Sequence, residues 1–285
     1  MRVEVNENSF IEADSILIGD NVKWGKDINI KVRGTFKIGS HSYVGDRFSA
    51  IAENITIGDY FFNVPTDSRG MFIGGGSSGF PYANLIIGDR CTCHTGHINL
   101  ARSVTIGDDV GLSHDVDIIT HGSPFSSFLE GYPVMFAGVN IGNSVIIGWK
   151  TTILGGTEIN NNIVVGSNST VTKSLLQERA VYAGSPAKLI KKINTPSLPE
   201  KKNLLNNMIL QFNELMSFYD VPNYTINTDC YPNLVINNLT INVETFHYSG
   251  EHDIITDAFR DFARRYGIRV FSPRGFRFKL ERKSK

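Results

Sequence analysis

Aliphatic residues recur at every sixth position along much of the chain. The longest unbroken series starts at residue 141 and consists of Ile141, Ile147, Ile153, Ile159, Val165 and Val171. Four positions after each of the first five comes a small or β-branched residue: Val145, Thr151, Thr157, Ile163 and Ser169. This period fits neither an amphipathic helix nor a single plain strand. It fits a short flat strand followed by a corner, and three such sides close one turn of a triangular coil.

Shorter series with the same period occur earlier in the chain. They are Ile18, Trp24 and Ile30, then Ile38, Val44 and Ala50, then Ile106, Leu112 and Ile118. We expect these side chains to point inward, and neighbouring coils to satisfy each other's backbone hydrogen bonds. Glycine often follows the aliphatic residue, and we expect it at corners that require unusual backbone angles. The pattern predicts a mainly β protein with a parallel β-helix over residues 1–193.

Two segments break the period and are expected to leave the coil as loops, at about 62–84 and 122–140. The first contains GMFIGGGSSGFPY, which is too rich in glycine for a regular strand. The second, GSPFSSFLEGYPVMFAGVN, has enough apolar area to pack against another surface. Its aromatic residues are Phe125, Phe128, Tyr132 and Phe136.

Residues 194–285 follow a different pattern and are expected to form a helix plus a small α+β domain. A helix is predicted over 199–219, with an apolar face that would pack on the β-helix. That face consists of Leu204, Met208, Phe212, Leu215 and Tyr219. Short strands within 234–246, a helix over 253–267 and a strand over 268–272 follow. The basic ending, 274–285, would contact an anionic polymer or the phosphates of a cofactor, or it would remain a solvated tail.

Composition narrows the class of protein. The 285 residues include 28 Lys and Arg against 28 Asp and Glu, so the formal charge is zero, which argues against a nucleic-acid backbone as main partner. The charged N-terminus lacks the apolar stretch of a signal peptide, and no apolar run is long enough to span a bilayer. Three cysteines in a chain of this length fit a reducing cytoplasm. Cys91 and Cys93 are expected to be small core residues rather than metal ligands.

The second half of the repeat resembles a known family. It begins IGNSVIIGWKTTILGGTEI and leads to Val171-Thr172-Lys173 and then to Gly184-Ser185-Pro186-Ala187-Lys188. The segment is similar to the hexapeptide-repeat acyltransferases, above all to the maltose and galactoside acetyltransferases and the acetyltransferases of bacterial surface-polysaccharide clusters. The resemblance is strong over residues 85–193 and weaker over 15–60. It implies a left-handed β-helix, a hand opposite to the usual crossover rule.

The resemblance also implies a catalytic histidine. In this family a coil ends with a histidine, the chain leaves in a loop, and the helix resumes with an I-G-x-x-V segment, as here at His121 and Ile141. A histidine titrates near neutral pH and can accept the proton of an acceptor hydroxyl or amine directly, so no serine or cysteine nucleophile is needed. An oxygen should hold its second ring nitrogen, and Asp115 and Asp117 are nearby candidates. His114 falls in mid-repeat and is expected to be a turn residue.

By motif position, the resemblance implies an acetyl-CoA site in a groove between adjacent subunits, and therefore a homotrimer. The residues implied are Trp149 and Ser167 for the pantetheine arm, Thr172 and Lys173 near the adenine, and Lys188 near the phosphates, with Lys191 as a second candidate there. Lysine is a flexible cationic partner for such phosphates. Trp149 is large for its position, so it would either narrow the groove or simply cover a corner. The excursion after His121 would reach the active site of a neighbouring subunit.

The residues that would bind the acceptor are the least defined. In this family, the coil before the catalytic one contributes acceptor contacts, and here that coil contains His94, His97 and Asn99. These side chains would line the acceptor pocket, or they would be ordinary exposed side chains on a repeat face. The sequence leaves both interpretations open.

These observations predict an acetyl-CoA-dependent O-acetyltransferase that modifies a carbohydrate hydroxyl, on a bacterial surface polysaccharide or its precursor, with no metal required. One alternative is an N-acetyltransferase acting on an aminosugar nucleotide. Another is a zinc enzyme of the γ-carbonic anhydrase type, which has two histidines five apart. Here His114 and His121 are seven apart and His94 and His97 are three apart, a spacing that disfavours zinc. A scaffold that kept the β-helix without catalysis is the last alternative.

Overall fold

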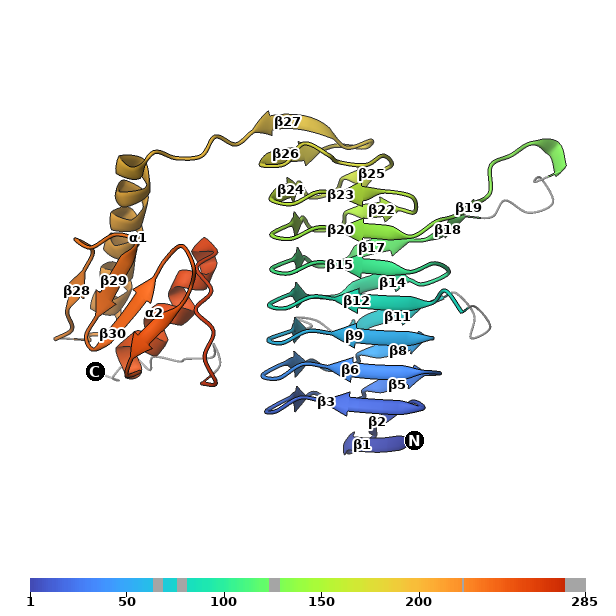
Figure 1. Ribbon diagram of the computed structural model, residues 1–285, viewed down its shortest axis with the longest axis horizontal. Helices are drawn as coiled ribbons and strands as arrows, with labels where there is room; N and C mark the ends of the chain where they lie inside the picture. The colour runs from blue at the N-terminus through green and yellow to red at the C-terminus, as the bar shows by residue number, and fades with distance from the viewer. Residues whose placement is uncertain (64–68, 76–80, 123–128, 222, 275–285) are drawn as a thin grey trace. The chain divides into compact units, whose positions relative to one another are not determined.

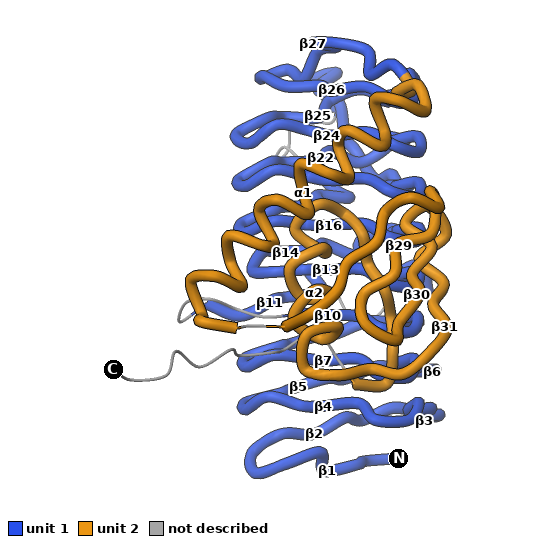
Figure 2. Tube along the Cα trace, turned by 90° about the vertical axis from the view of Figure 1, so that its left-hand side faces the viewer, with its two compact units in different colours: residues 1–194 blue, residues 195–285 orange. Residues whose placement is uncertain are grey.

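The computed structural model describes residues 1–63, 69–75, 81–122, 129–221 and 223–274. The chain divides into two compact units, Met1–Asn194 and Thr195–Lys285, shown in different colours in Figure 2. Each unit has its own hydrophobic core.

The first unit is a coil of short strands stacked in three sheets (Figure 1). Sheet A runs in the order β1 (Arg2–Asn6), β2 (Ser9–Glu12), β5 (Asn29–Val32), β8 (Ser49–Ala52), β11 (Met71–Gly74), β14 (Gly96–Asn99), β17 (Val116–Ile119), β22 (Thr152–Leu154), β25 (Thr170–Val171). Sheet B runs in the order β3 (Ser15–Ile18), β6 (Thr35–Ile38), β9 (Asn54–Ile57), β12 (Asn84–Ile87), β15 (Val104–Ile106), β20 (Val139–Ile141), β23 (Glu158–Ile159). Sheet C runs in the order β4 (Lys23–Trp24), β7 (Tyr43–Val44), β10 (Phe62–Asn63), β13 (Thr92–Cys93), β16 (Gly111–Leu112), β21 (Ile146–Ile147), β24 (Ile163–Val165), β26 (Ala180–Ala183), β27 (Lys188–Lys192).

Neighbouring strands within each sheet are parallel, except at the two ends of the coil. There β1 pairs antiparallel with β2, and β27 pairs antiparallel with β26. The chain passes from sheet A to sheet B to sheet C in every coil, which makes three corners. We call the corner between the ends of sheet A strands and the starts of sheet B strands the A/B edge, and name the B/C and C/A edges in the same way. The predicted fold class, a parallel β-helix, is confirmed.

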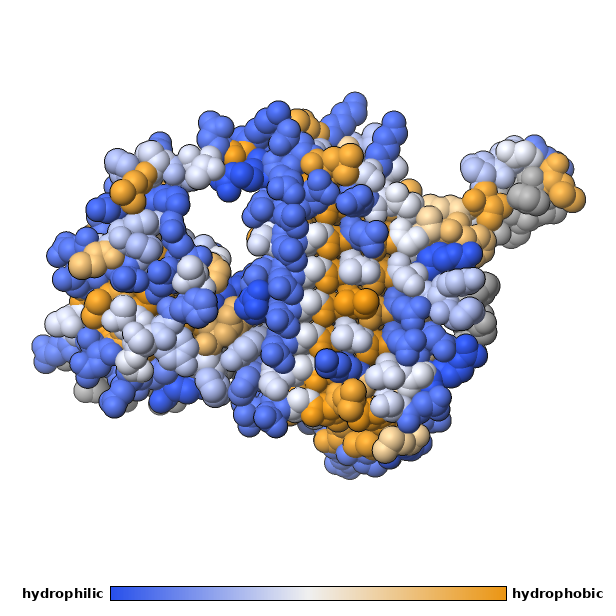
Figure 3. All heavy atoms as spheres, viewed as in Figure 1, coloured by the Kyte–Doolittle hydropathy of each residue, from blue (hydrophilic) through white to orange (hydrophobic). Residues whose placement is uncertain are grey.

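The residues of the six-residue period fill the interior. From Ile141 to Val171 every aliphatic residue of the series is at most 3% exposed, and the small residues between them are buried as well. Burying one such side chain stabilises the fold by about 1.5–3 kcal/mol, so this column holds the coils together. The first coil differs, because Ile18 is 39% exposed and Trp24 is only partly buried. Its inward side chains lack a complete coil beneath them, and Figure 3 shows apolar atoms at this end, over β3.

The glycines that follow the aliphatic residues serve a different purpose from the one expected. Gly58 and Gly88 do not have positive φ; the left-handed residues are two positions further on, at Tyr60 and Arg90. A Cβ atom on Gly58 would instead collide with Oδ1 of Asp89 in the next coil. Glycine is therefore required at these corners because another side chain occupies the space, not because of its backbone freedom.

Asp89 belongs to a series of side chains that link the coils along the B/C edge. Each accepts a hydrogen bond from the backbone N–H of the equivalent residue in the coil before it, at 2.7–3.0 Å. We call this series the corner ladder, and it consists of Ser40, Asp59, Asp89, Asp108, Asn143 and Asn161. Beside it, the Arg90 guanidinium bonds Asp109 at 2.9 Å, and these hydrogen bonds raise the pKa of Arg90 despite partial burial.

The loops only partly follow the expectation. Within 62–84 the structure contains β10 and β11, so Met71–Gly74, at the start of the glycine-containing segment, is a regular strand of sheet A rather than part of a projecting loop. Residues 64–68 and 76–80 of the predicted loop lie outside the described residues. The excursion after His121 starts as β18 (His121–Gly122) and returns as β19 (Met135–Phe136), which pair antiparallel. Of its aromatic residues, Tyr132 and Phe136 are exposed, whereas Phe125 and Phe128 lie outside the described residues.

The second unit packs two helices against an antiparallel sheet. The helices are α1 (Leu198–Phe218) and α2 (Ile254–Ala263). Helix α2 continues into a short 3-10 turn (Arg264–Tyr266). The strand order is β28 (Ile226–Asn227), β29 (Asn233–Ile236), β30 (Leu239–Asn242) and β31 (Tyr248–Gly250). No strand forms over 268–272, and the basic ending lies outside the described residues from 275 onward.

The apolar face of α1 is used within its own unit. Met208 and Phe212 are buried there as predicted, but Leu204 is 59% exposed and Leu205 takes its place. The Phe212 ring lies 5.2 Å from that of Phe259 on α2. The expectation that this helix face packs on the β-helix is therefore corrected, since its side chains form the core of the second unit.

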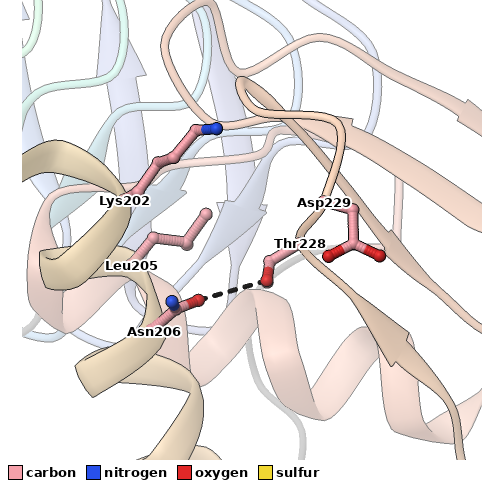
Figure 4. Close-up of a pocket in the computed structure, with 5 residues that line it drawn as sticks. All are labelled: Lys202, Leu205, Asn206, Thr228 and Asp229. Carbon is pink, nitrogen blue, oxygen red and sulfur yellow. Dashed lines mark hydrogen bonds between the residues drawn. The ribbon is translucent and has the colours of Figure 1, made fainter. Parts of the chain in front are cut away.

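A shallow pocket lies between α1 and the segment after β28 (Figure 4). It is lined by Lys202, Leu205, Asn206, Thr228 and Asp229, and Thr228 Oγ1 donates to Asn206 Oδ1 at 3.1 Å. One cation, one carboxylate and one amide around an apolar floor do not point to a particular class of ligand.

Neither helix in the described part of the chain is long and apolar enough to cross a membrane.

Candidate active site

His121 lies on the A/B edge, at the point where the chain leaves the β-helix. It follows β17 after one residue and forms β18 with Gly122. The antiparallel partner of His121 is Phe136, and the two rings stack with centroids 5.9 Å apart and planes 25° apart. The returning strand of the excursion therefore covers one side of the imidazole.

The second ring nitrogen of His121 is held by Asn99. Nδ1 lies 2.8 Å from Oδ1 of Asn99, the last residue of β14 in the preceding coil. Thr120 bonds the same oxygen through its hydroxyl, at 2.7 Å, and its backbone N–H lies 3.3 Å away. Asn99 and Thr120 are 2% and 0% exposed, so this contact is buried. Asn99, not Asp115 or Asp117, orients the ring.

The surroundings of Asn99 determine which ring nitrogen carries the proton. Its Nδ2 donates to the backbone oxygen of Gly75 at 3.1 Å, and a flipped amide would put two oxygens against each other there. Oδ1 therefore faces His121 and can only accept, so Nδ1 of the neutral ring carries the hydrogen. Nε2 is then the unprotonated nitrogen, which is the one that a general base needs.

Asp115 and Asp117 serve elsewhere. Asp117 lies on the outer face of sheet A, where its backbone is paired with that of His97. Asp115 lies on the C/A edge and bonds Arg69 at 2.8 Å and the indole N–H of Trp149 at 3.2 Å. Burial raises the pKa of Asp115, but the hydrogen bonds from Trp149 and Arg69 outweigh this, and the pKa is lowered overall.

Three rings follow one another along the C/A edge in consecutive coils. His94 and His114 have centroids 4.3 Å apart, and His114 and Trp149 have centroids 5.7 Å apart. His114 is a corner residue, as predicted, and Thr95 Oγ1 lies 3.3 Å from its Nδ1. Trp149 covers this corner while remaining 50% exposed.

The residues predicted for acetyl-CoA therefore separate into two groups. Three of them lie along the C/A edge: Trp149 follows β21, Ser167 follows β24, and Lys188 begins β27. Thr172 and Lys173 follow β25 on the A/B edge, the same edge as His121 and two strands further along sheet A. A sheet A strand of four residues separates the two edges by roughly 13 Å. One chain alone does not bring Trp149 to His121.

His94, His97 and Asn99 also occupy different places. His94 is on the C/A edge, Asn99 bonds His121, and His97 lies between them on the outer face of sheet A, with Phe72 5.1 Å away. Nε2 of His97 is buried and has no hydrogen-bond partner among the described residues. Of the three, Asn99 has the direct relation to the candidate base.

No family model matches the chain, and no curated protein matches its sequence. Solved structures do match. The solved structures that this chain resembles include hexapeptide-repeat acetyltransferases.

Three of these relatives illustrate the range. An acetyltransferase from Vibrio cholerae, also solved with acetyl coenzyme A, is 21% identical with a TM-score of 0.36; the match covers 39% of this chain and 64% of that enzyme, slightly less than two thirds. A polySia-specific acetyltransferase is 20% identical with a TM-score of 0.43, covering 70% and 97%. A polysialic acid O-acetyltransferase is 24% identical with a TM-score of 0.41, covering 66% and 90%.

The sequence did not reveal two parts of the site. Thr120 stands directly before His121 but gave no signal, because its role depends on a contact with Asn99 in the preceding coil. Arg102 and Phe136 come together only because the returning strand of the excursion, β19, passes beside the coil that precedes His121. Among the described residues, no three His, Cys, Asp or Glu side chains are arranged to hold a metal ion.

Proposed function

We propose that this protein is an acetyl-CoA-dependent O-acetyltransferase that modifies a hydroxyl of a carbohydrate, a bacterial surface polysaccharide or its precursor. The observation that carries the proposal is the bond from His121 Nδ1 to a buried and fixed Asn99 oxygen. It leaves Nε2 without a proton at the point where the chain leaves the coil. The bond fixes both the orientation of the ring and the nitrogen that carries the proton, as a general base requires.

The base would act on the acceptor rather than on the donor. His121 Nε2 takes the hydroxyl proton as the acceptor oxygen attacks the thioester carbonyl, and the resulting imidazolium shares its Nδ1–H with Asn99. When the carbon–sulfur bond breaks, the same nitrogen returns the proton to the departing thiolate. The Asn99 amide carries no charge. It therefore orients the ring without the added stabilisation of the imidazolium that a carboxylate partner would give.

A site shared between copies of the chain fits the separation of the two edges. Trp149, Ser167 and Lys188 of one copy would hold the donor, and His121 of the next would receive it, in a homotrimer. The exposed excursion supports this arrangement, because Leu129 is 89% exposed and Tyr132 is 59% exposed. Exposed apolar side chains of this kind mark a surface that another molecule covers. Lys173 and Lys188 are exposed and would meet the negative charges of coenzyme A.

An N-acetyltransferase acting on an aminosugar nucleotide is the second candidate. It would use the same His121–Asn99 pair, since an amine also loses a proton on acyl transfer. The two differ in the acceptor alone, so a panel that contains both hydroxyl and amine acceptors distinguishes them. A zinc enzyme is disfavoured by the spacing of the histidines, since His114 and His121 are seven positions apart and His94 and His97 are three apart.

The deciding experiment measures thiol release from acetyl-CoA with a panel of polysaccharides, oligosaccharides and aminosugar nucleotides. The wild type is compared with His121→Ala and with His41→Ala, a matched control whose ring stacks on Tyr60 at the B/C edge. We expect transfer to a sugar hydroxyl, a loss of about 100- to 10,000-fold in kcat for His121→Ala, and wild-type rates for the control. Coenzyme A binding should survive the substitution. An active His121→Ala variant would place the base elsewhere, and absence of coenzyme A binding would favour a scaffold.

A further inference from the structure

Gly75 lies on the same A/B edge as the candidate base, two coils before it. It follows β11, Asn99 ends β14, and His121 follows β17, and these three strands are neighbours in sheet A. The backbone oxygen of Gly75 accepts a hydrogen bond from Nδ2 of Asn99 at 3.1 Å. Oδ1 of the same amide lies 2.8 Å from Nδ1 of His121. One asparagine side chain therefore connects the backbone of one coil to the imidazole two coils further along.

The two ends of the Asn99 amide are held differently. Oδ1 is approached by the Thr120 hydroxyl at 2.7 Å, by the backbone N–H groups of Thr120 and Ala101 at 3.3 and 3.4 Å, and by the His121 ring. For Nδ2, Gly75 supplies the acceptor within the described part of the chain. Because the amide is planar, the direction of Nδ2 also sets the direction of Oδ1. The Gly75 oxygen therefore helps to fix the plane in which Oδ1 meets the imidazole.

The backbone of Gly75 is held against Asn99 with no room for a side chain. Its φ is +87°, a conformation that glycine adopts without steric cost. A Cβ atom at this position would lie 2.7 Å from Nδ2 of Asn99 and 3.5 Å from Nε2 of His97. The preceding residue is anchored as well, because the Gly74 oxygen accepts a hydrogen bond from the backbone N–H of Leu100 at 2.9 Å. Glycine therefore allows this carbonyl group to approach the Asn99 amide.

A side chain at position 75 would disturb the contact between Asn99 and His121. The end of a side chain yields more readily than the backbone, so the Asn99 amide would move away from the new Cβ atom. Asn99 is 2% exposed, and its other end is the partner of the ring. A rotation that moves Nδ2 also moves Oδ1, since both belong to one planar group. A misplacement of about 1 Å in a catalytic arrangement can cost about 100-fold in rate.

We propose that Gly75 is a positioning residue for the base. Through Asn99, its carbonyl oxygen and its lack of a side chain keep the imidazole of His121 in the orientation and tautomer that proton abstraction requires. This inference rests on the proposed function, because it concerns the same reaction. Since Gly75 acts through Asn99, its substitution changes turnover and the state of the imidazole, and not the affinity for acetyl-CoA. Three consecutive coils then contribute to the catalytic part of the A/B edge.

A double-mutant cycle tests whether Gly75 acts through Asn99. Gly75→Ala should lower kcat about 10- to 100-fold, as for other groups that support a functional histidine, with KM for acetyl-CoA nearly unchanged. In the Asn99→Ala background there is no amide to displace, so the same substitution should change kcat by no more than about twofold. Equal losses of kcat in both backgrounds would overturn the inference, since Gly75 would then act on something other than Asn99.

Two further variants separate the contact with Asn99 from strain in the backbone. Gly267→Ala is the matched control, since Gly267 has a φ of +79° and no atom within 4 Å of its Cβ position, and it should transfer acetyl groups at the wild-type rate. Gly75→Asn also introduces a Cβ atom, but asparagine tolerates positive φ better than alanine does. It should therefore fold more readily than Gly75→Ala and still lower kcat. Wild-type kcat in either Gly75 variant would overturn the inference.

A second measurement does not depend on turnover. The nitrogen-15 NMR signals of the His121 ring, identified by their absence from His121→Ala, report which ring nitrogen carries the proton. We expect Nδ1–H in the neutral ring of the wild type and a mixture of both tautomers in Gly75→Ala. A pure Nδ1–H tautomer in Gly75→Ala would overturn the inference and leave the proposed function standing. A wild type that transfers no acetyl group would overturn the proposed function, and the NMR comparison would still decide whether Gly75 orients the ring.

Discussion

Nδ1 of His121 and Oδ1 of Asn99 lie 2.8 Å apart, although 22 positions separate the two residues in the sequence. The contact crosses from one coil to the next, so the imidazole is held by the neighbouring turn of the β-helix as well as by its own. Thr120 reinforces the link from the side of His121. The orientation of the candidate base therefore depends on how the two coils stack.

Substitution of Asn99 should impair turnover more than binding. Asn99→Ala removes the acceptor that selects the ring nitrogen, and we expect kcat to fall about 10- to 100-fold, as for other partners that orient a functional histidine, with KM for acetyl-CoA nearly unchanged. Asn99→Asp keeps an acceptor but adds a charge that stabilises the protonated ring, so the acidic limb of the pH–rate profile should move to higher pH. Steady-state kinetics across pH measure both effects. Wild-type kcat in Asn99→Ala would show that another group holds the ring.

Two inactive variants should restore activity when they assemble together. If His121 of one copy works with the C/A edge of another, mixing His121→Ala with Trp149→Ala/Lys188→Ala creates some intact sites. In a cyclic trimer formed by random mixing at equal amounts, about a quarter of the sites combine both wild-type edges. The measurement is the acetyl-transfer rate after the two chains are unfolded and refolded together. No recovery in verified mixed trimers would mean that each site is built from one chain.

The close approach of coils at the B/C edge predicts a sharp difference between two glycines. Gly58→Ala would place a methyl group 2.7 Å from the Gly88 carbonyl carbon and against Asp89 Oδ1, so the free energy of unfolding should fall by about 1–3 kcal/mol. Gly111→Ala is the control, since no atom lies within 4 Å of its Cβ position, and it should be neutral or stabilising by up to about 1 kcal/mol.

Denaturation in urea, followed by tryptophan fluorescence, measures this difference within the full chain. Both tryptophans, Trp24 and Trp149, belong to the first unit, so the signal reports on the β-helix. Equal stability of the two alanine variants would contradict the steric explanation of the corner glycines.

The second unit should lose stability as the pH falls below neutrality. Burial lowers the pKa of His252, and the nearby charge of Arg260 lowers it further, while Asp257, 3.6 Å away, opposes this. The folded state then binds fewer protons than the unfolded state, so stability falls as the pH drops through the ordinary histidine range and levels off below the folded pKa.

Helical circular dichroism measures this transition, because both helices belong to the second unit. His252→Gln should flatten the pH dependence between about pH 7 and 5. His247→Gln, at an exposed position, should leave it unchanged. A wild type whose helical signal melts at the same urea concentration across this range would contradict the prediction.

The sequence predicted the architecture well because each side of the β-helix places an inward aliphatic residue at every sixth position, and this period is visible in the sequence. Ile147 and Ile153 are buried because they occupy the same inward position on successive six-residue sides. This holds whichever residues lie between them. The role of the glycines was harder to predict. It depends on a side chain in the next coil, such as Asp89 against Gly58, and not on the local sequence.

The site was predicted in part for a related reason. His121 could be found because it ends a series, but its partner could not be sought among neighbours such as Asp115. In a stacked coil the neighbours in space are one turn away, and the excursions change how many residues a turn contains. The variable number of residues per turn also prevented us from predicting that Trp149 and His121 lie on different edges, because the corner that each residue occupies cannot be assigned from the sequence.

The corner ladder continues without interruption from Ser40 to Asn161, and no excursion leaves the coil at that corner. Across each turn, the inward residue that ends a sheet B strand and its counterpart in sheet C are six positions apart, from Ile38 and Val44 to Ile159 and Val165. The excursion after His121 leaves at the A/B edge instead. The protein thus keeps one corner invariant in length and accepts insertions at another, which would let its choice of acceptor change through loop length alone while the coil that presents the base stays as it is.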